Sequence, residues 1–385
     1  MTTLRRREFL AGVAGTALAA RPMHARAEAA TPPRFMYVGS FTRKDGGHGE
    51  GLSVFHRASP GDRWTRIQLL TELADPSFIV IDRAGRHLYS SHGDGTQATS
   101  YDIDPATGKL TVKNRQPTGG VNGAHVSMDP GGRFLAIANY ASGALAIVPI
   151  NADGSLAAVS DSAAMTGTPG PNRTQQESSH PHHCPFDRSG RFIVVPDKGL
   201  DKVFVYRLDV SSGKLSPGNP PSVASRAGAA PRHVDFHPTL PFAYVINELD
   251  STMTTYRYEP EKGVLKPLQV ITTLPTSYTG NNTGAEVVVA PSGRFVYGSN
   301  RGHDSIAIFS VDAATGLLTS AGWEPTQGQT PRFFTLDPTG TQLYAANQAS
   351  DTIVVFDVNA STGKLKATGE VIKVATATTI AFGRS

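Results

Sequence analysis

The stretch PRFFTLDPTGTQLYAANQASDTIVVFDVNASTGKLKATGEV, residues 331–371, decides the fold. It contains four short runs rich in β-branched and aromatic residues, and clusters of Gly, Pro, Asp and Ser separate them. This pattern is typical of strands joined by tight turns. No amphipathic helical segment lies between the runs, so a parallel sheet of strand–helix–strand units is not expected. The four expected strands are Phe333–Thr335, Gln342–Ala346, Thr352–Val358 and Lys364–Val371.

The same unit recurs about every 50 residues along the chain. Its first turn aligns without gaps at six places, and the six copies begin at Pro76, Gly123, Pro181, Pro231, Gly284 and Pro331. Four antiparallel strands per copy, repeated radially, predict a β-propeller. Each copy would form one blade, and its first strand would line the central channel.

Two fragments outside the six copies supply one more blade. Arg34–Phe41 and Gly51–His56 look like the later strands of a blade, and Thr378–Phe382 looks like a first strand without a partner. Joining them closes the ring and leaves no open sheet edge. We therefore predict an all-β, seven-bladed β-propeller with four antiparallel strands per blade, closed by N- and C-terminal strands that share one blade. A single domain is expected over residues 34–385, after a linker at residues 28–33.

Residues 1–27 have the pattern of an export signal. The sequence RRREFL, residues 5–10, precedes a modest apolar stretch, and Ala25-Arg26-Ala27 offers a small-residue cleavage site. Paired arginines followed by Phe-Leu are typical of the twin-arginine type, which exports folded proteins. We therefore expect a periplasmic or secreted protein; the alternative is a basic, disordered tail.

Removing residues 1–27 changes the charge balance. That segment holds five arginines and one glutamate, and the remaining chain has equal numbers of basic and acidic residues. The basic pI of the whole chain therefore gives no support for a nucleic-acid or anionic-membrane partner. After the signal no segment is long and apolar enough to span a bilayer. The expected mature protein is a monomer that binds a small molecule, with no nucleic-acid partner and no membrane insertion.

Cys184 is the only cysteine, so an intramolecular disulfide is impossible. It ends the stretch SHPHHC, in which His180, His182 and Cys184 would share one face of a strand and could suggest zinc. However, Cys184 aligns with interior valines of three other copies, where a cysteine acts as a small apolar group. Those valines are Val126, Val234 and Val287. We expect no metal and no other cofactor.

Two columns of the repeat change their chemistry from copy to copy. The first column is the second residue of each copy: Ser77, Ala124, His182, Arg232, Ala285 and Arg332. The second column lies at the end of the second strand: Gly93, Tyr140, Lys198, Glu248, Arg301 and Gln348. Because the two strands run antiparallel, both columns should lie at the same mouth of the channel, which is the usual place for a ligand.

The polar members of these columns indicate the chemistry. A carboxylate and an imidazole can move protons near neutral pH. Arginines can hold a carboxylate or a phosphate, or stabilise an oxyanion. The sequence has no G-x-S-x-G elbow and no cysteine nucleophile in the cluster, which disfavours acyl-enzyme chemistry. Water that is activated by a base and attacks an ester carbonyl held by arginine fits better, although Glu248 with Arg232 or Arg301 could also be a structural ion pair.

Two further columns favour structural roles. The repetition of His125, His183 and His233, with Glu286 in the same column, suggests side chains that bond to a neighbouring blade. An asparagine column more readily serves turns than ligands; its members are Asn139, Asn247, Asn300 and Asn347. The residues kept as candidate substrate contacts are Lys198, Arg332, His233 and Asn300.

Five motifs carry a resemblance to a known family: YVGSFT at 37–42, PRHVDFHP at 231–238, VINEL at 245–249, SNRGHDS at 299–305 and TPRFF at 330–334. From Tyr37 to Phe382 the chain resembles the seven-bladed lactonase family, which groups bacterial propeller-type 6-phosphogluconolactonases with fungal carboxy-cis,cis-muconate cyclases. The family's active-site set is a His, an Arg, a Glu and a second Arg. Residue by residue it falls here on His182, Arg232, Glu248 and Arg301. The stretch PDKG at 196–199 departs from the family's usual Asp-Leu-Gly, so Lys198 is expected to alter the rim or the substrate.

The resemblance implies a lactone hydrolase that needs no metal. Glu248 or His182 would act as general base on water, and Arg232 and Arg301 would hold the lactone oxygens and an anionic group. Export makes a cytoplasmic sugar phosphate an unsuitable substrate, so a non-phosphorylated aldonolactone or another anionic lactone is expected. The alternatives are a lactone-forming muconate cycloisomerase and a propeller that binds a ligand or partner without catalysis.

Overall fold

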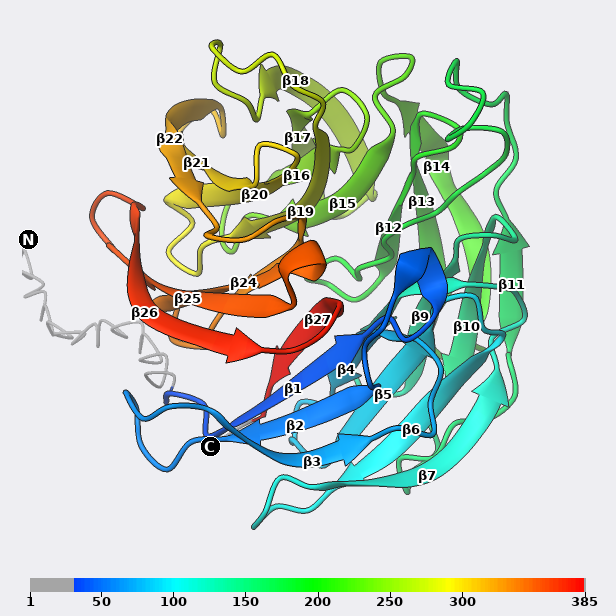
Figure 1. Ribbon diagram of the computed structural model, residues 1–385. Helices are drawn as coiled ribbons and strands as arrows, with labels where there is room; N and C mark the ends of the chain where they lie inside the picture. The colour runs from blue at the N-terminus through cyan, green and yellow to red at the C-terminus, as the bar shows by residue number, and fades with distance from the viewer. Residues whose placement is uncertain (1–30, 384–385) are drawn as a thin grey trace, which may run out of the picture. The chain divides into compact units, whose positions relative to one another are not determined.

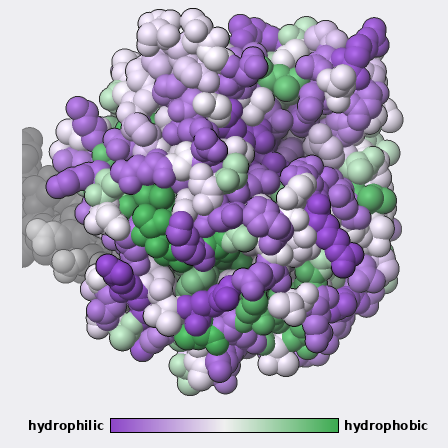
Figure 2. All heavy atoms as spheres, in the orientation of Figure 1, coloured by the Kyte–Doolittle hydropathy of each residue, from purple (hydrophilic) through white to green (hydrophobic). Residues whose placement is uncertain are grey.

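The structure is a computed structural model that describes residues 31–383. The proposed export signal at residues 1–27 and the first part of the linker lie outside these residues. Seven antiparallel sheets form a ring, which confirms the seven-bladed propeller (Figure 1). In Figure 2, hydrophilic side chains cover most of the visible face, and hydrophobic residues form smaller areas between them. No helix within residues 31–383 is long and apolar enough to cross a membrane.

The blades follow one another along the chain. The first blade comprises β4 (Pro76–Ile81), β5 (His87–His92), β6 (Gln97–Ile103) and β7 (Leu110–Pro117). The second comprises β8 (Gly123–Met128), β9 (Phe134–Asn139), β10 (Ala144–Pro149) and β11 (Asp161–Ala164). The third comprises β12 (Phe192–Asp197), β13 (Lys202–Asp209) and β14 (Lys214–Ala224). The fourth comprises β15 (Pro231–Phe236), β16 (Phe242–Asn247), β17 (Thr252–Glu259) and β18 (Val264–Thr272).

The last three blades complete the ring. The fifth comprises β19 (Thr283–Val289), β20 (Phe295–Arg301), β21 (Ser305–Val311) and β22 (Leu318–Pro325). The sixth comprises β23 (Pro331–Leu336), β24 (Gln342–Asn347), β25 (Thr352–Val358) and β26 (Leu365–Lys373). The seventh comprises β27 (Ala377–Phe382), β1 (Phe35–Ser40), β2 (Leu52–His56) and β3 (Thr65–Leu70). Two short 3₁₀ turns, η1 (Lys44–Gly46) and η2 (Gln348–Ser350), lie in loops.

The seventh blade joins the two ends of the chain, as predicted. β1 pairs antiparallel with β27, with Tyr37 opposite Ala381 and Gly39 opposite Thr379, and the two strands lie side by side in Figure 1. Gly39 is required by close packing, because a Cβ there would overlap the carbonyl oxygen of Pro76 in the first blade. The C-terminal strand thus supplies the inner strand of a blade whose other strands come from the N-terminus.

A repeated contact fastens four of the seven blades to the blade that follows. A buried tyrosine on the second strand of one blade donates its hydroxyl hydrogen to the carbonyl of a hairpin glycine in the following blade. The pairs are Tyr37 with Gly108, Tyr89 with Gly154, Tyr244 with Gly316, and Tyr297 with Gly363, at 2.9 to 3.1 Å. These glycines have positive φ, which an L side chain rarely adopts. The recurring hairpin glycines in the sequence therefore serve both the turn and the joint between blades.

The third blade has an irregular inner segment. Residues 181–186 take the place of the first strand, but they meet β12 only through two isolated bridges, Pro181 with Asp197 and Phe186 with Ile193. Pro181 and Pro185 have no N–H to donate to a ladder, so the continuous sheet of this blade has three strands. The backbone N–H of His182 still donates to Pro196 O at 3.1 Å, which keeps this segment in register.

We expect that deleting residues 377–385 destabilises the entire ring. The deletion removes β27, leaves β1 with an unpaired edge and exposes buried neighbours of Ile380. The free energy of unfolding should fall by about 4 kcal/mol or more, measured by urea denaturation. Deleting only residues 384–385 is the control and should change it little. Equal stability of the two truncated proteins would contradict the proposed closure.

Candidate functional site

The two variable columns line one cavity of about 380 Å³ at a mouth of the channel. It receives residues from the first column (Ser77, Ala124, His182, Arg232, Arg332) and from the second (Tyr140, Lys198, Glu248, Arg301). The antiparallel pairing of first and second strands causes this convergence. In the fourth blade, for example, Pro231 lies opposite Asn247, so the residues that follow them emerge at the same end.

At the centre of the site, the carboxylate of Glu248 contacts three cations. Its Oε1 lies 2.8 Å from Lys198 Nζ and 3.4 Å from a terminal nitrogen of Arg301, and its Oε2 lies 3.1 Å from Arg232 Nε. All four side chains are mostly or fully buried. The sequence allowed an ion pair of Glu248 with one arginine; the structure has Glu248 paired with both arginines and with Lys198 as well.

The electrostatics of this cluster keep Glu248 ionised. Burial alone would raise the pKa of Glu248, but the positive charges of Lys198, Arg301 and Arg232 outweigh burial and hold that pKa well below its ordinary value. Burial, together with the charges of Arg301 and Arg332, lowers the pKa of Arg232 to about 9. One carboxylate therefore partly neutralises several cations, and the net charge of the cavity remains positive.

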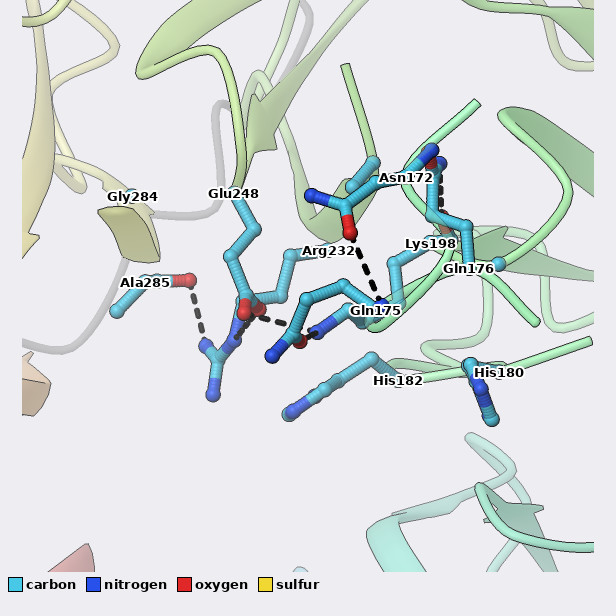
Figure 3. A network of polar contacts seen from close by, with 12 residues as sticks. Asn172, Gln175, Gln176, His180, His182, Lys198, Arg232, Glu248, Gly284 and Ala285 are labelled. Carbon is cyan, nitrogen blue, oxygen red and sulfur yellow. Dashed lines mark hydrogen bonds and ion pairs between the residues drawn. The ribbon is translucent and has the colours of Figure 1, made fainter. Parts of the chain in front are cut away.

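Backbone carbonyls of the fifth blade fix the two arginines. Arg232 donates to Ala285 O at 2.6 Å, and Arg301 donates to Gly284 O at 3.0 Å. Figure 3 shows Arg232 held between Glu248 and Ala285. The Nε atom of Arg301 is buried and makes no hydrogen bond within residues 31–383, whereas Nε of Arg232 faces Glu248 in the ion pair described above. Of these two N–H groups, the one of Arg301 has no protein partner among the described residues.

Lys198 is held by a loop that sequence reasoning did not assign to the site. Lys198 Nζ donates to Gln175 Oε1 at 3.1 Å, and Gln176 binds the carbonyl of Lys198 at 2.7 Å (Figure 3). Thr174 and Gln175 also line the cavity. The signal for this loop was the interval between the second and third copies of the repeat, which is the longest in the chain.

The seventh blade contributes further residues that the alignment missed. Phe41 and Thr378 occupy the same two column positions there, since Ser40 lies opposite Ala377. Extending the alignment to the terminal fragments would have found both. Lys44 and Asp45 come from the loop after β1 and also line the cavity. The residues that line it without belonging to the two columns are Lys44, Asp45, Phe78, Asn122, Thr174, Gln175, His233 and Phe333.

Arg332 differs from the other cations of the cavity. Its guanidinium makes no hydrogen bond and no ion pair with any described residue, and it lies over the ring of Phe41, 4.9 Å from the centroid. By contrast, Lys44 is paired with Asp94 at 2.7 Å. Burial and the charge of Arg301 lower the pKa of Arg332 to about 10, so it remains charged at neutral pH. Arg332 is thus a preoriented cation that can take an anionic group.

His182 lies against the floor of the cavity. Its Nδ1 is 3.1 Å from Nε2 of His233, and its ring meets Tyr140 edge-on at 5.6 Å between centroids. In Figure 3 the ring projects to the side on which the guanidinium of Arg232 lies. Burial, and then the charge of Arg232, hold the pKa of His182 well below its ordinary value. At neutral pH His182 is therefore an uncharged imidazole.

The column of His125, His183, His233 and Glu286, here called the third column, has the interblade contacts that its repetition predicted. His125 Nδ1 lies 3.3 Å from Cys184 Sγ, His183 Nδ1 accepts from the N–H of Val234 at 3.3 Å, and His233 Nδ1 lies 2.8 Å from Glu286 Oε1. Each contact joins one blade to the next. His233 also lines the cavity floor, so it has both a structural position and access to the site.

The stretch from His180 to Cys184 does not gather on one face. His180 stacks on Tyr140 and contacts Glu177, whereas Cys184 is fully buried in the core beside the carbonyl of Ala136. Cys184 thus occupies the interior position that its alignment with valines predicted, and burial raises the pKa of its thiol to about 12. Among residues 31–383, no three His, Cys, Asp or Glu side chains are placed to hold a metal ion.

Asn300 does not reach the cavity, contrary to its selection as a substrate contact. Its amide nitrogen donates to Thr273 O and Ser305 Oγ, and its amide oxygen accepts from Thr273 and Asn282. These bonds use the side chain to fasten the end of β20 to adjacent loops, which is the alternative that the asparagine column suggested. Asn300 therefore has no place in the site proposed below.

Comparisons with known proteins agree with this architecture. The sequence matches the family described as "Lactonase, 7-bladed beta-propeller" over residues 35–382. It is 36% identical over 304 residues to a 6-phosphogluconolactonase of Bacillus subtilis, covering 78% of this chain and 84% of that relative. It is 31% identical over 312 residues to a 6-phosphogluconolactonase of Formosa agariphila, covering 78% and 86%. The solved structure of a periplasmic gluconolactonase from Pseudomonas aeruginosa superposes with a TM-score of 0.84 at 28% identity, covering 91% of this chain and 99% of that one.

Proposed function

The chain belongs to the seven-bladed β-propeller lactonase family, and from this premise we propose that it hydrolyses a lactone with His182 as the general base. The observation that carries the proposal is the arrangement in the cavity: an uncharged imidazole beside three cations that one carboxylate holds together. An imidazole can take a proton from water, and fixed cations can stabilise the oxyanion that forms at an ester carbonyl.

The reaction follows from this geometry. His182 Nε2 takes a proton from a water molecule while the water oxygen forms a bond to the lactone carbonyl carbon. The negative charge that develops on the carbonyl oxygen is held by Arg232 and Arg301. When the tetrahedral intermediate collapses, the bond from this carbon to the ring oxygen breaks, and the ring oxygen receives the proton from His182. The product is the open-chain hydroxy acid, and the resting imidazole is restored.

The pKa of both groups is held below its ordinary value, but the depth of the lowering and the pairing of Glu248 favour His182 as the base. A carboxylate whose pKa is held far below neutral by three cations has little tendency to take a proton from water. Its oxygens are also occupied by Lys198 and the arginines. The role that fits Glu248 is to hold Lys198, Arg232 and Arg301 in the positions that receive the oxyanion. Removing one such donor typically costs about 10²–10³-fold in rate.

The substrate class follows from the charge of the cavity. Glu248 partly compensates Lys198, Arg232 and Arg301, but Arg332 has no ion-pair partner among the described residues, and only the more distant charges of Asp45 and Glu248 act on it. A substrate that carries a carboxylate or phosphate would supply that partner. We therefore propose an anionic lactone, with its anionic group on Arg332 and its lactone group between His182 and Arg232. The sequence analysis kept Arg332 as a candidate substrate contact and not as a member of the catalytic set, because it lies outside the family's active-site residues.

The expected result for His182→Gln is a fall in kcat of about 10²–10⁴-fold, since a positioned general base contributes that much. The measurement is pH-stat titration of the acid released from glucono-1,5-lactone, 6-phosphoglucono-1,5-lactone and glucaro-1,4-lactone. His180→Gln is the matched control: it changes a buried histidine two residues away that does not line the cavity, and it should keep wild-type kcat.

Three outcomes would contradict the proposal. Full activity of His182→Gln would remove His182 as the base. Loss of muconate absorbance without lactone hydrolysis would reassign the site to cycloisomerisation. Activity of the wild-type protein on neither class would leave a ligand-binding propeller.

Arg332→Leu tests the charge of the substrate. For the phosphorylated or carboxylated lactone, kcat/KM should fall about 10- to 100-fold, because a hydrogen bond to a charged group is worth about 1.5–3 kcal/mol. For the neutral glucono-1,5-lactone it should change little, and this lactone is the internal control. An equal loss on charged and neutral lactones would show that Arg332 acts on the architecture of the site rather than on the anion.

We also propose that the chain is exported to the periplasm after cleavage of residues 1–27. The twin-arginine pattern supports this location, as does the similarity to a gluconolactonase described as periplasmic. In that compartment a carboxylated lactone suits the site better than a sugar phosphate. The intact mass of the protein recovered from periplasmic extract should correspond to a chain that begins at Glu28. A mass that corresponds to a start at Met1 would contradict the export proposal.

A further inference from the structure

A chain of three buried side chains runs from the cavity floor into the fifth blade. His182 Nδ1 lies 3.1 Å from His233 Nε2, and His233 Nδ1 lies 2.8 Å from Glu286 Oε1. The three residues come from consecutive blades, the third, fourth and fifth. Building on the hydrolysis proposed above, we propose that His233 and Glu286 form a proton relay that sets the tautomer of His182 and accepts the charge that His182 gains during catalysis.

The hydrogen-bonding capacities of these groups fix which nitrogen donates and which accepts along the series His182, His233 and Glu286. An ionised carboxylate only accepts, so Glu286 requires a hydrogen on Nδ1 of His233. A neutral His233 then has a lone pair on Nε2, which accepts from Nδ1 of His182. His182 is left with its lone pair on Nε2, the ring nitrogen that is free of contacts within the described residues. This is the tautomer that a general base requires, with its basic nitrogen turned toward the cavity.

The positive surroundings of His182 explain why such a relay is needed. Arg232, His233, Arg332 and Lys198 all disfavour a proton on His182, in addition to burial. A full imidazolium would therefore be costly at this position. If the Nδ1 proton of His182 passes to His233 as Nε2 takes one from water, and the Nδ1 proton of His233 passes to Glu286, both imidazoles remain neutral. No oxidant or further reactant is needed, and the reverse transfers supply the proton for the leaving oxygen.

The surroundings of Glu286 allow its carboxyl group to accept a proton and to release it again. Its Oε1 also accepts from the N–H of Val287 at 3.0 Å, whereas its Oε2 is buried without a hydrogen bond inside residues 31–383. Burial raises the pKa of Glu286 to about 7, although the neighbouring His183 and Arg232 act in the opposite direction. A carboxyl with a proton affinity near neutrality can both take and return a proton at physiological pH.

A purely structural role does not account for this chain. The strands that carry His233 and Glu286, β15 and β19, are already joined by Arg232 to Ala285 O and by Asp235 to the N–H of Val289 at 2.7 Å. Asp235 is partly buried, and burial, together with the charge of Glu286, raises its pKa to about 7 as well. Its bonds go only to backbone N–H groups, so it joins the same strands without any contact to His182. Asp235 is therefore a matched control for Glu286.

The test is the pH dependence of kcat between pH 5 and 8, on the fastest of the three lactones above. For the wild-type protein, kcat should decline as pH falls below about 7, because protonated Glu286 can no longer accept. In Glu286→Gln the decline of kcat should move to lower pH. The value of kcat on its high-pH plateau should also fall about 10- to 100-fold, as is typical when a side chain that orients a reacting group is removed. His233→Gln breaks the same chain at its middle and should give the same profile. The double variant should lose no more than either single one.

Because Asp235 and Glu286 act on each other through their charges, Asp235→Asn should shift the pH profile less than Glu286→Gln does, and it should keep the wild-type plateau of kcat. Unchanged profiles in both Glu286→Gln and His233→Gln, with hydrolysis intact, would overturn the relay and leave the proposed function standing. Failure of the wild-type protein to hydrolyse any lactone would overturn both. A shifted profile in Asp235→Asn equal to that of Glu286→Gln would show that any buried charge on these strands has the effect, and would also overturn the relay.

Thermal stability reports the ionisation of Glu286 independently of activity. A folded-state pKa raised above the unfolded value contributes stability at low pH that is lost as pH rises through the folded pKa. The wild-type protein should therefore lose stability between pH 5 and pH 8 as Glu286 ionises, whereas Gln does not ionise. The difference between the Tm of Glu286→Gln and the Tm of the wild-type protein should become more positive over this range. Asp235→Asn should show the same trend without the fall in the plateau of kcat. A Tm difference independent of pH would contradict the ionisation of Glu286 that the relay requires.

Discussion

The antiparallel pairing of β1 with β27 is the constraint on which the rest of the molecule depends. A ring of sheets buries all its inner strands only when the last sheet meets the first, and here the final inner strand comes from the opposite end of the chain. Once the ring is closed, every inner strand has a fixed neighbour on both sides. The residues at the ends of those strands then reach one mouth of the channel at fixed distances. The precision of the site is thus a property of the closed ring rather than of any one loop.

Within that frame, Glu248 controls the electrostatics of the cavity. Several cations brought together without an anion would repel one another, and a buried carboxylate without cations would take up a proton. The ion-pair cluster formed by Glu248 with Lys198, Arg232 and Arg301 prevents both the repulsion among the cations and the protonation of the carboxylate. Its formation removes four charges from water, which is energetically costly. Breaking such a cluster by removing one partner typically costs about 3–5 kcal/mol. Because the cations outnumber the carboxylate, the cluster still attracts an anion.

Much of the fold and part of the site could be predicted because repetition separates structural positions from variable ones. Six blades and the two columns came from aligning copies, and the shared seventh blade came from the two unpaired fragments at the ends of the chain. The alignment missed Phe41 and Thr378, since each terminal fragment is too short to show the repeat alone. It also missed Gln175, which lies on a loop with no counterpart in other blades. Asn300 was misplaced because sequence alone could not show that every polar atom of its side chain is used within the protein.

The third column shows how one repeated position can acquire a chemical role. In the second and third blades its histidines meet a thiol or a backbone N–H, which are weak or neutral partners. Of these histidines, His233 is the one that lies within hydrogen-bonding distance both of an acid, Glu286, and of His182. Stacking of His183 on His233, with 4.2 Å between ring centroids, keeps this ring in place. A position that joins blades through His125 and His183 can therefore pass a proton at His233, because the partners of His233 on both sides can gain and lose one.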